Sequence, residues 1–104
     1  MEGYKKQLSH SISYSLAFKQ EALSEWRKLD AGTREQFKKK LAERLTIPHV
    51  PSARLRGRSN RYKIKLRNIG YRLVYEVRDA ELIVPVIAVG KRERSAVYKA
   101  AAKR

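Results

Sequence analysis

Hydrophobic and polar residues alternate along several stretches of the chain, and such alternation predicts β-strands. The first stretch is 13–18, and two more, 61–67 and 71–77, flank a turn signal at 68–70. A fourth segment, 82–89, is apolar at nearly every position, which is typical of a central strand with helices covering one side. We therefore expect one strand near the beginning of the chain and three consecutive antiparallel strands in its second half.

Apolar residues recur at helical spacing between the first strand and the others. One amphipathic helix is predicted within 19–30, and a second from Thr33, which together with Gln36 has the spacing of a capping box. Neither helix can bury its apolar stripe alone, so the two are expected to pair in antiparallel fashion and to pack on the sheet. A short helix around Tyr98 follows the last strand. The predicted fold is thus α+β, an antiparallel sheet with two N-terminal helices on one face and a short C-terminal helix.

The alternation also fixes how the second and third strands face each other. Opposed residues of an antiparallel pair lie on the same face of the sheet, so apolar Ile64 must be matched with an apolar residue such as Leu73. This matching requires an even number of loop residues, either two or four. In both cases Lys63, Lys65 and Arg72 share one face, which is the main geometric prediction from the sequence.

Pro85 interrupts the fourth predicted strand. Because proline has no backbone N–H to donate to a neighbouring strand, a bulge or a free edge is expected near it.

Length and composition limit the classes of protein that are possible. The 104 residues suffice for one domain, predicted at 12–104 after a flexible extension at 1–11, and 42% hydrophobic content allows a real core. The lack of cysteine excludes a disulfide framework and thiolate chemistry. The longest apolar run has eight residues, far fewer than the ~20 that span a bilayer, and no secretory signal is visible. A cytoplasmic protein without a membrane partner is expected.

Charge is the most unusual feature of the composition. The chain carries 25 Lys and Arg against 10 Asp and Glu, a formal charge of +15, which points to a polyanionic partner. Nucleic acid is the first candidate, an acidic protein the second and an anionic membrane surface the third. From Arg44 through Tyr75 there are nine basic residues and no acidic one. A face that serves solubility alone usually mixes both signs, so this clustering favours a binding surface.

The residues that could carry out catalysis are few. No acidic residues have the spacing of a magnesium or zinc site, so neither a metal nor another cofactor is expected. His10 falls in the predicted extension and His49 between two prolines, which makes a histidine acid–base pair a poor candidate. Lys, Arg and Tyr remain, and they suffice for one reaction, the cleavage of RNA by attack of its own 2′-hydroxyl on the adjacent phosphate.

Six segments of the chain carry a resemblance to a known family: ALSEWRKL at 22–29, REQFKKKL at 34–41, LRG at 55–57, YKIKLR at 62–67, GYRLVYEV at 70–77 and VGKRERSAVY at 89–98. In this order and spacing they resemble the RelE family of bacterial toxins. The resemblance implies a small fold like that of microbial ribonucleases. It also implies a metal-independent endoribonuclease that cleaves mRNA in the ribosomal A site, inhibits translation and is silenced by an acidic RelB-type antitoxin. The implied partners are therefore mRNA, the ribosome with its RNA, and the antitoxin.

The resemblance also implies which residues form the site. The family's catalytic positions fall on Lys63, Lys65, Arg72, Arg92 and Tyr98. The two arginines would bind the scissile phosphate, a lysine would act as general acid or base, and Tyr98 would stack on a base or assist proton transfer. Which of Lys63, Lys65 and Tyr98 accepts the 2′-hydroxyl proton stays open. RNA backbone would be held by Arg54, Arg56, Arg58, Arg61, Arg67, Lys91 and Arg94.

Two other functions compete with this one. A ParE-like inhibitor of DNA gyrase shares the fold but does not need the five catalytic positions together. A non-catalytic RNA- or ribosome-binding module would use the basic face for phosphates alone.

Overall fold

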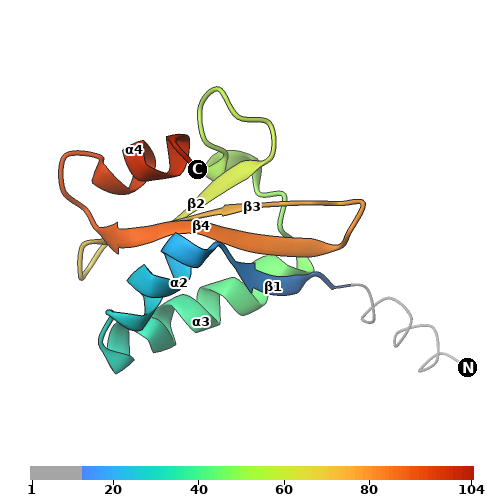
Figure 1. Ribbon diagram of the computed structural model, residues 1–104. Coiled ribbons are helices and arrows are strands. Elements are labelled where there is room, and N and C mark those ends of the chain that lie inside the picture. Colours follow the sequence, from blue (N-terminus) through green and yellow to red (C-terminus); the bar gives the residue numbers. More distant parts are fainter. Residues whose placement is uncertain (1–12) are drawn as a thin grey trace, which may run out of the picture.

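A four-stranded sheet organises residues 13–104, the part of the chain that the computed structural model describes. The elements along the chain are β1 (Ser15–Phe18), α2 (Gln20–Arg27), α3 (Ala31–Thr46), the 3-10 turn η1 (Pro51–Ala53), β2 (Arg61–Leu66), β3 (Tyr71–Glu76), β4 (Ile83–Lys91) and α4 (Ala96–Ala102). This order of strand, two helices, three strands and helix confirms the sequence prediction (Figure 1). The predicted extension at 1–11 lies outside the described residues.

The strands lie in the order β1-β4-β3-β2. The pairs β2–β3 and β3–β4 are antiparallel, as the sequence predicts, but β1 pairs with β4 in parallel. The prediction of a purely antiparallel sheet was therefore wrong for its first strand. The chain leaves β1 through α2 and α3, which cross one face of the sheet, and crossovers of this kind connect parallel strands.

The register between β2 and β3 confirms the predicted face. Ile64 lies opposite Leu73 and Lys65 lies opposite Arg72, with residues 67–70 forming a four-residue loop. Gly70 closes this loop at φ +70°, a conformation that a side chain would make unfavourable. Lys63, Lys65 and Arg72 consequently project from the same side of the sheet.

Helices cover both faces of the sheet, with α2 and α3 on one side and α4 on the other (Figure 1). The larger core joins Phe37 and Leu41 of α3 to the sheet face that carries Tyr62 and Ile64. On the opposite face, Val97 and its neighbours in α4 form a smaller cluster with β3 and β4. The apolar composition of β4 thus reflects cover on both of its faces, not on one as the sequence analysis expects. No helix within residues 13–104 has the length and apolar character needed to cross a membrane.

Two local predictions have different outcomes. The capping box at Thr33 was wrong, because the Thr33 backbone N–H donates to Asp30 Oδ1 at 2.7 Å and Asp30 is the N-cap of α3. The expected irregularity near Pro85 is confirmed. Val74 lies opposite Ala88 whereas Tyr75 lies opposite Val86, which leaves a bulge in β4 two residues beyond the proline.

Candidate active site and nucleic-acid interface

The five predicted catalytic residues surround two hollows beside α4. Lys65, Arg72, Arg92 and Tyr98 line a hollow of about 220 Å³. Lys63 and the same Tyr98 line a second hollow of about 330 Å³. Because Tyr98 borders both, the structure gathers side chains from β2, β3, β4–α4 and α4 into one region of the surface.

Positive charge dominates the smaller hollow, whose lining has four basic residues and one acidic residue, Glu93. The ammonium of Lys63 lowers the pKa of Lys65, and partial burial and the guanidinium groups of Arg67 and Arg72 lower it further. Arg72 is only 7% exposed and donates from Nη1 to the carbonyl of Tyr71 at 3.0 Å. A lysine with a lowered pKa releases its proton more readily than an isolated lysine, which suits Lys65 to proton exchange.

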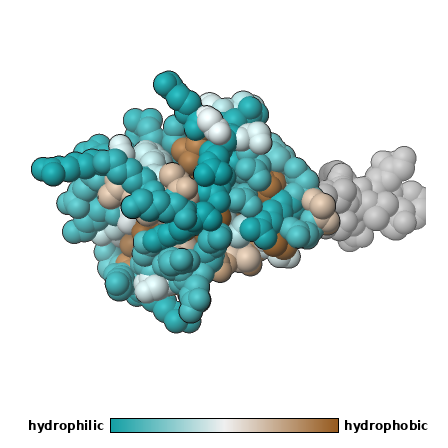
Figure 2. Space-filling model, turned by 45° about the horizontal axis from the view of Figure 1, so that its top comes forward, coloured by the Kyte–Doolittle hydropathy of each residue, from teal (hydrophilic) through white to brown (hydrophobic). Residues whose placement is uncertain are grey.

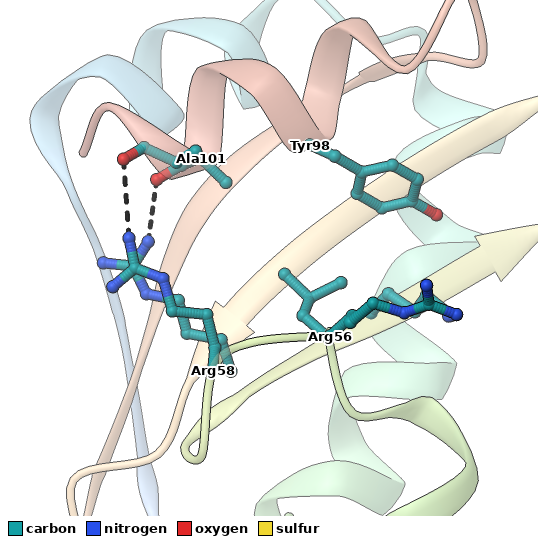
Figure 3. A pocket seen from close by; sticks show the side chains of 8 residues that line it. Arg56, Arg58, Tyr98 and Ala101 are labelled. Atoms are coloured by element: carbon teal, nitrogen blue, oxygen red, sulfur yellow. Dashed lines mark hydrogen bonds between the residues drawn. The ribbon is translucent and has the colours of Figure 1, made fainter.

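Tyr98 projects from α4 over the larger hollow, toward the loop that carries Arg56 (Figure 3). Its hydroxyl is buried and has no hydrogen-bond partner among the described residues. Buried hydroxyl groups are normally satisfied, so this unpaired one is an exception in a side chain that borders both hollows. The aromatic ring offers in addition a flat surface on which a base can stack.

Most of the predicted RNA-binding residues lie where a polyanion can reach them. Six of the seven are exposed, namely Arg54, Arg56, Arg58, Arg67, Lys91 and Arg94. Hydrophilic residues cover most of this side of the molecule, and hydrophobic ones appear only as small areas between them (Figure 2). The seventh, Arg61, is 6% exposed and its guanidinium is already engaged by Glu76 and by the carbonyl of Ala101.

Arg44 is a basic residue that the sequence analysis did not assign to the site. Its Nη1 donates to the carbonyl of Lys63 at 3.2 Å and to the Tyr75 hydroxyl at 2.8 Å. It lines a hollow of about 250 Å³ together with Lys63, Lys65 and Arg67. Its position at the start of the acid-free segment 44–75 was the only sequence signal, because its partners come from distant β2 and β3.

His49 lies away from these hollows. Its Nδ1 is 3.0 Å from the hydroxyl of Tyr62 and its Nε2 is 2.8 Å from Asp79 Oδ1. Tyr62 packs into the core on the face opposite to Lys63, so this histidine supports the core edge. His10 lies outside the described residues, and no group of three or more His, Asp or Glu within 13–104 is arranged to hold a metal ion.

Comparison with known proteins defines the class. Residues 16–96 match the family described as the ParE toxin of type II toxin–antitoxin systems, parDE, and the chain belongs to this family of toxins.

The relatives within that class are RelE toxins. The chain is 56% identical over 93 residues to the mRNA interferase toxin RelE of Escherichia coli (strain K12). The aligned residues make up 89% of this chain and 98% of the relative. The mRNA interferase RelE of Shigella flexneri matches with the same identity and coverage. This chain is therefore RelE-like, as its sequence motifs indicate.

Solved RelE structures share the fold. An arginine double mutant of E. coli toxin RelE in the free state superposes with a TM-score of 0.82 at 54% identity, covering 88% of this chain and 97% of that one. The toxin in the intact E. coli RelBE toxin–antitoxin complex gives a TM-score of 0.75 at 55% identity, covering 79% and 100%. The α+β fold predicted from the sequence is confirmed.

Proposed function

We propose that this toxin is an endoribonuclease that cleaves mRNA in the ribosomal A site and thereby inhibits translation. The observation that carries the proposal is the convergence of Lys63, Lys65, Arg72, Arg92 and Tyr98 on two hollows that share Tyr98. The names of the relatives, mRNA interferases, support the same substrate.

The reaction uses a nucleophile that the RNA itself supplies. The 2′-hydroxyl oxygen attacks the adjacent phosphorus, the bond from phosphorus to the 5′-oxygen breaks, and a 2′,3′-cyclic phosphate forms. The 2′-hydroxyl proton passes to a base, and the departing 5′-oxygen receives a proton from an acid. Atoms and charge balance without a covalent enzyme intermediate and without a cofactor.

The basic residues have distinct roles in this reaction. Arg72 and Arg92 bind the phosphate oxygens and stabilise the negative charge that grows on them in the transition state. Lys65 accepts the 2′-hydroxyl proton, a role supported by its lowered pKa among Lys63, Arg67 and Arg72. Tyr98 stacks on a base and so orients the sugar for in-line attack.

The partners follow from charge. The exposed arginines bind ribosomal RNA, and the ribosome presents the message to the site. Because ribosomes translate in the cytoplasm, the toxin acts there. An acidic RelB-type antitoxin, like the partner in the E. coli RelBE complex, neutralises the basic face, either by covering it or by displacing α4 together with Tyr98.

Replacing Arg72 by Gln tests the proposal on ribosomes programmed with a defined message. The variant should lose about 10²–10³ in cleavage rate, as expected when a transition-state donor is removed, while still binding the ribosome. Lys38→Ala is the control, because Lys38 is exposed on α3 and pairs only with Glu35.

Two results would contradict the proposal. A uniform, modest loss of affinity with no change in rate would indicate a binding module. Growth arrest that persists in the variant together with gyrase inhibition would indicate a ParE-like activity.

A further inference from the structure

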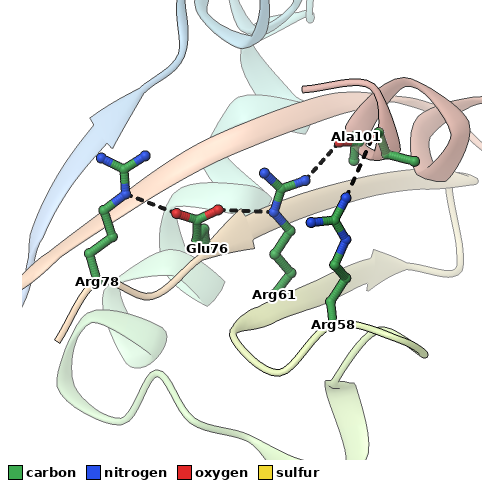
Figure 4. Close-up of polar contacts among 6 residues, drawn as sticks. Arg58, Arg61, Glu76, Arg78 and Ala101 are labelled. Carbon is green, nitrogen blue, oxygen red and sulfur yellow. Dashed lines mark hydrogen bonds and ion pairs between the residues drawn. The ribbon is translucent and has the colours of Figure 1, made fainter.

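Arg61 is a charged residue almost wholly removed from solvent. It begins β2 directly opposite Glu76 of β3, and its Nε donates to Glu76 Oε1 at 3.0 Å. Its Nη1 donates to the backbone carbonyl of Ala101 in α4 at 2.7 Å. One guanidinium therefore joins two strands to the helix above them (Figure 4).

The partner on α4 is a backbone carbonyl at the C-terminal end of the helix. Ala101 lies in the last turn of the helix, and its carbonyl also accepts from the backbone N–H of Arg104 at 3.0 Å, so Arg61 is a second donor to this oxygen. A cation at a helix C-terminus is electrostatically favourable, and the planar fork of arginine holds a carboxylate and a carbonyl in a fixed geometry, whereas the ammonium of lysine is a compact charge with freely rotating donors. Arg78 Nε holds the other oxygen of Glu76 at 2.8 Å, so the carboxylate is fixed from both sides.

Two other arginines hold the same end of the helix. Arg58 Nη2 donates to the carbonyl of Ala102 at 3.5 Å. Arg104, just after the helix, binds Glu25 and the carbonyl of Ile87.

The helix itself has seven residues, AVYKAAA, of which only Val97 and Ala101 are buried. Helices of this length are not stable alone, so tertiary contacts determine where α4 lies. Arg61 is thus one of several polar ties at this end of α4, and it is the almost wholly buried one that starts from the strand carrying Lys63.

Tyr98 precedes Ala101 by three residues, and residues at this spacing lie on the same side of a helix. Arg61, Tyr98 and Ala101 all line the larger hollow. A contact that fixes the Ala101 carbonyl therefore also fixes where the Tyr98 ring stands.

We propose that Arg61 is a positioning residue, which holds Tyr98 over the hollow by binding the carbonyl of Ala101. The effect of Arg61 on cleavage rests on the function proposed above, but its effect on the position of Tyr98 does not. Direct binding of RNA by Arg61 would require breaking its contacts with Glu76 and Ala101. Arg72, by contrast, is almost equally buried, but among the described residues its guanidinium donates only to the carbonyl of Tyr71.

A double-mutant cycle tests the catalytic part by single-turnover cleavage on saturating programmed ribosomes. Arg61→Met should lower the rate about tenfold or more, because small displacements of an aligned group are costly. In a Tyr98→Ala background the same change should have little further effect. Arg78→Met is the matched control, since Arg78 binds the same Glu76 without touching α4, and its rate should stay within about twofold of the unmodified toxin.

Two results would overturn this part. The fold losses in cleavage rate caused by Arg61→Met and Tyr98→Ala could multiply in the double variant, which would mean that the two residues act independently. Alternatively, Arg61→Met could reduce the dependence of binding on log salt by about one, which marks a lost phosphate contact.

A second measurement needs no activity. In the free protein with ¹³C-labelled tyrosine rings, Arg61→Met should shift or broaden the NMR signals of Tyr98, whereas Arg78→Met should not. If the unmodified toxin cleaves no message while these shifts occur, the proposed function fails and the positioning role stands. Unchanged Tyr98 signals in the folded variant would refute the positioning role. If Arg61→Met does not fold, Arg61→Lys, which keeps the charge without the fork, should give the same change at smaller size.

Discussion

Lys65 and Arg72 lie directly opposite each other on β2 and β3, with both side chains on the sheet face that carries α4. Like charges in directly opposed positions of a sheet destabilise it. Lys63 lies on the same face, two residues along β2, and adds to the repulsion. The proposed function explains this cost, because a phosphate group bound to these residues would relieve the repulsion between them.

This repulsion predicts that removing one of the cations stabilises the folded protein, by an amount that depends on the salt concentration. Lys65→Met should raise the melting temperature slightly at low ionic strength, because one of the mutually repelling cations is gone. The gain should vanish near 1 M salt, where the screening length is only ~3 Å. Thermal denaturation across a salt series measures it, and a gain that is independent of salt would point to packing instead.

The lowered pKa of Lys65 predicts a shift in the pH dependence of cleavage. If Lys65 accepts the 2′-hydroxyl proton, the rate rises with pH until its amine is neutral. Lys63→Met removes the largest cause of the lowered pKa, so the pKa of Lys65 should rise and the ascending limb should move to higher pH. The position of the limb is the readout, not its height.

Lys63→Arg is the control for this experiment, because it keeps the positive charge and should leave the limb in place. A limb that stays fixed in Lys63→Met would assign the proton transfer to a group other than Lys65.

Glu76 predicts acid sensitivity of the fold. Burial raises the pKa of this carboxyl, but hydrogen bonds from Arg78 and Arg61 outweigh that effect and lower it below its usual 4.5. A group whose pKa is lower in the folded state stabilises the fold above its unfolded pKa, and this contribution is lost as the pH falls through the folded value. Denaturant titrations from neutral pH to below about 4.5 should therefore show a smaller loss of unfolding free energy in Glu76→Gln than in the unmodified protein.

Glu35→Gln is the comparison, because Glu35 forms only an exposed pair with Lys38 and should leave the pH dependence nearly unchanged. If the free energy of unfolding falls equally with pH in Glu76→Gln and in the unmodified toxin, the Glu76 ion pairs do not stabilise the fold.

The register of β2 and β3 could be predicted because it depends on local pattern. Strict alternation in 61–67 and 71–77 leaves only even loops, and each of them places Lys65 and Arg72 on one face. The parallel pairing of β1 with β4 could not be predicted in this way. It joins Ser15 to Ile83 across most of the chain, and an alternating strand fits either direction.

The role of Arg61 shows a second limit. Alternation assigns it to the same exposed basic face as Lys63, and the sequence carries no sign that Glu76 and the end of α4 bury it. The N-cap of α3 was missed for a related reason, since Asp30 and Thr33 are both good caps and only the backbone geometry selects Asp30.

The most direct test is the cleavage of a defined message with and without programmed ribosomes, followed by analysis of the new RNA ends. We expect cleavage only when ribosomes are present, with a 2′,3′-cyclic phosphate or the derived 3′-phosphate on the upstream fragment. Cleavage that leaves a 3′-hydroxyl, or no cleavage together with simple retention of RNA, would contradict the proposed 2′-hydroxyl mechanism and the roles given to Lys65, Arg72 and Tyr98.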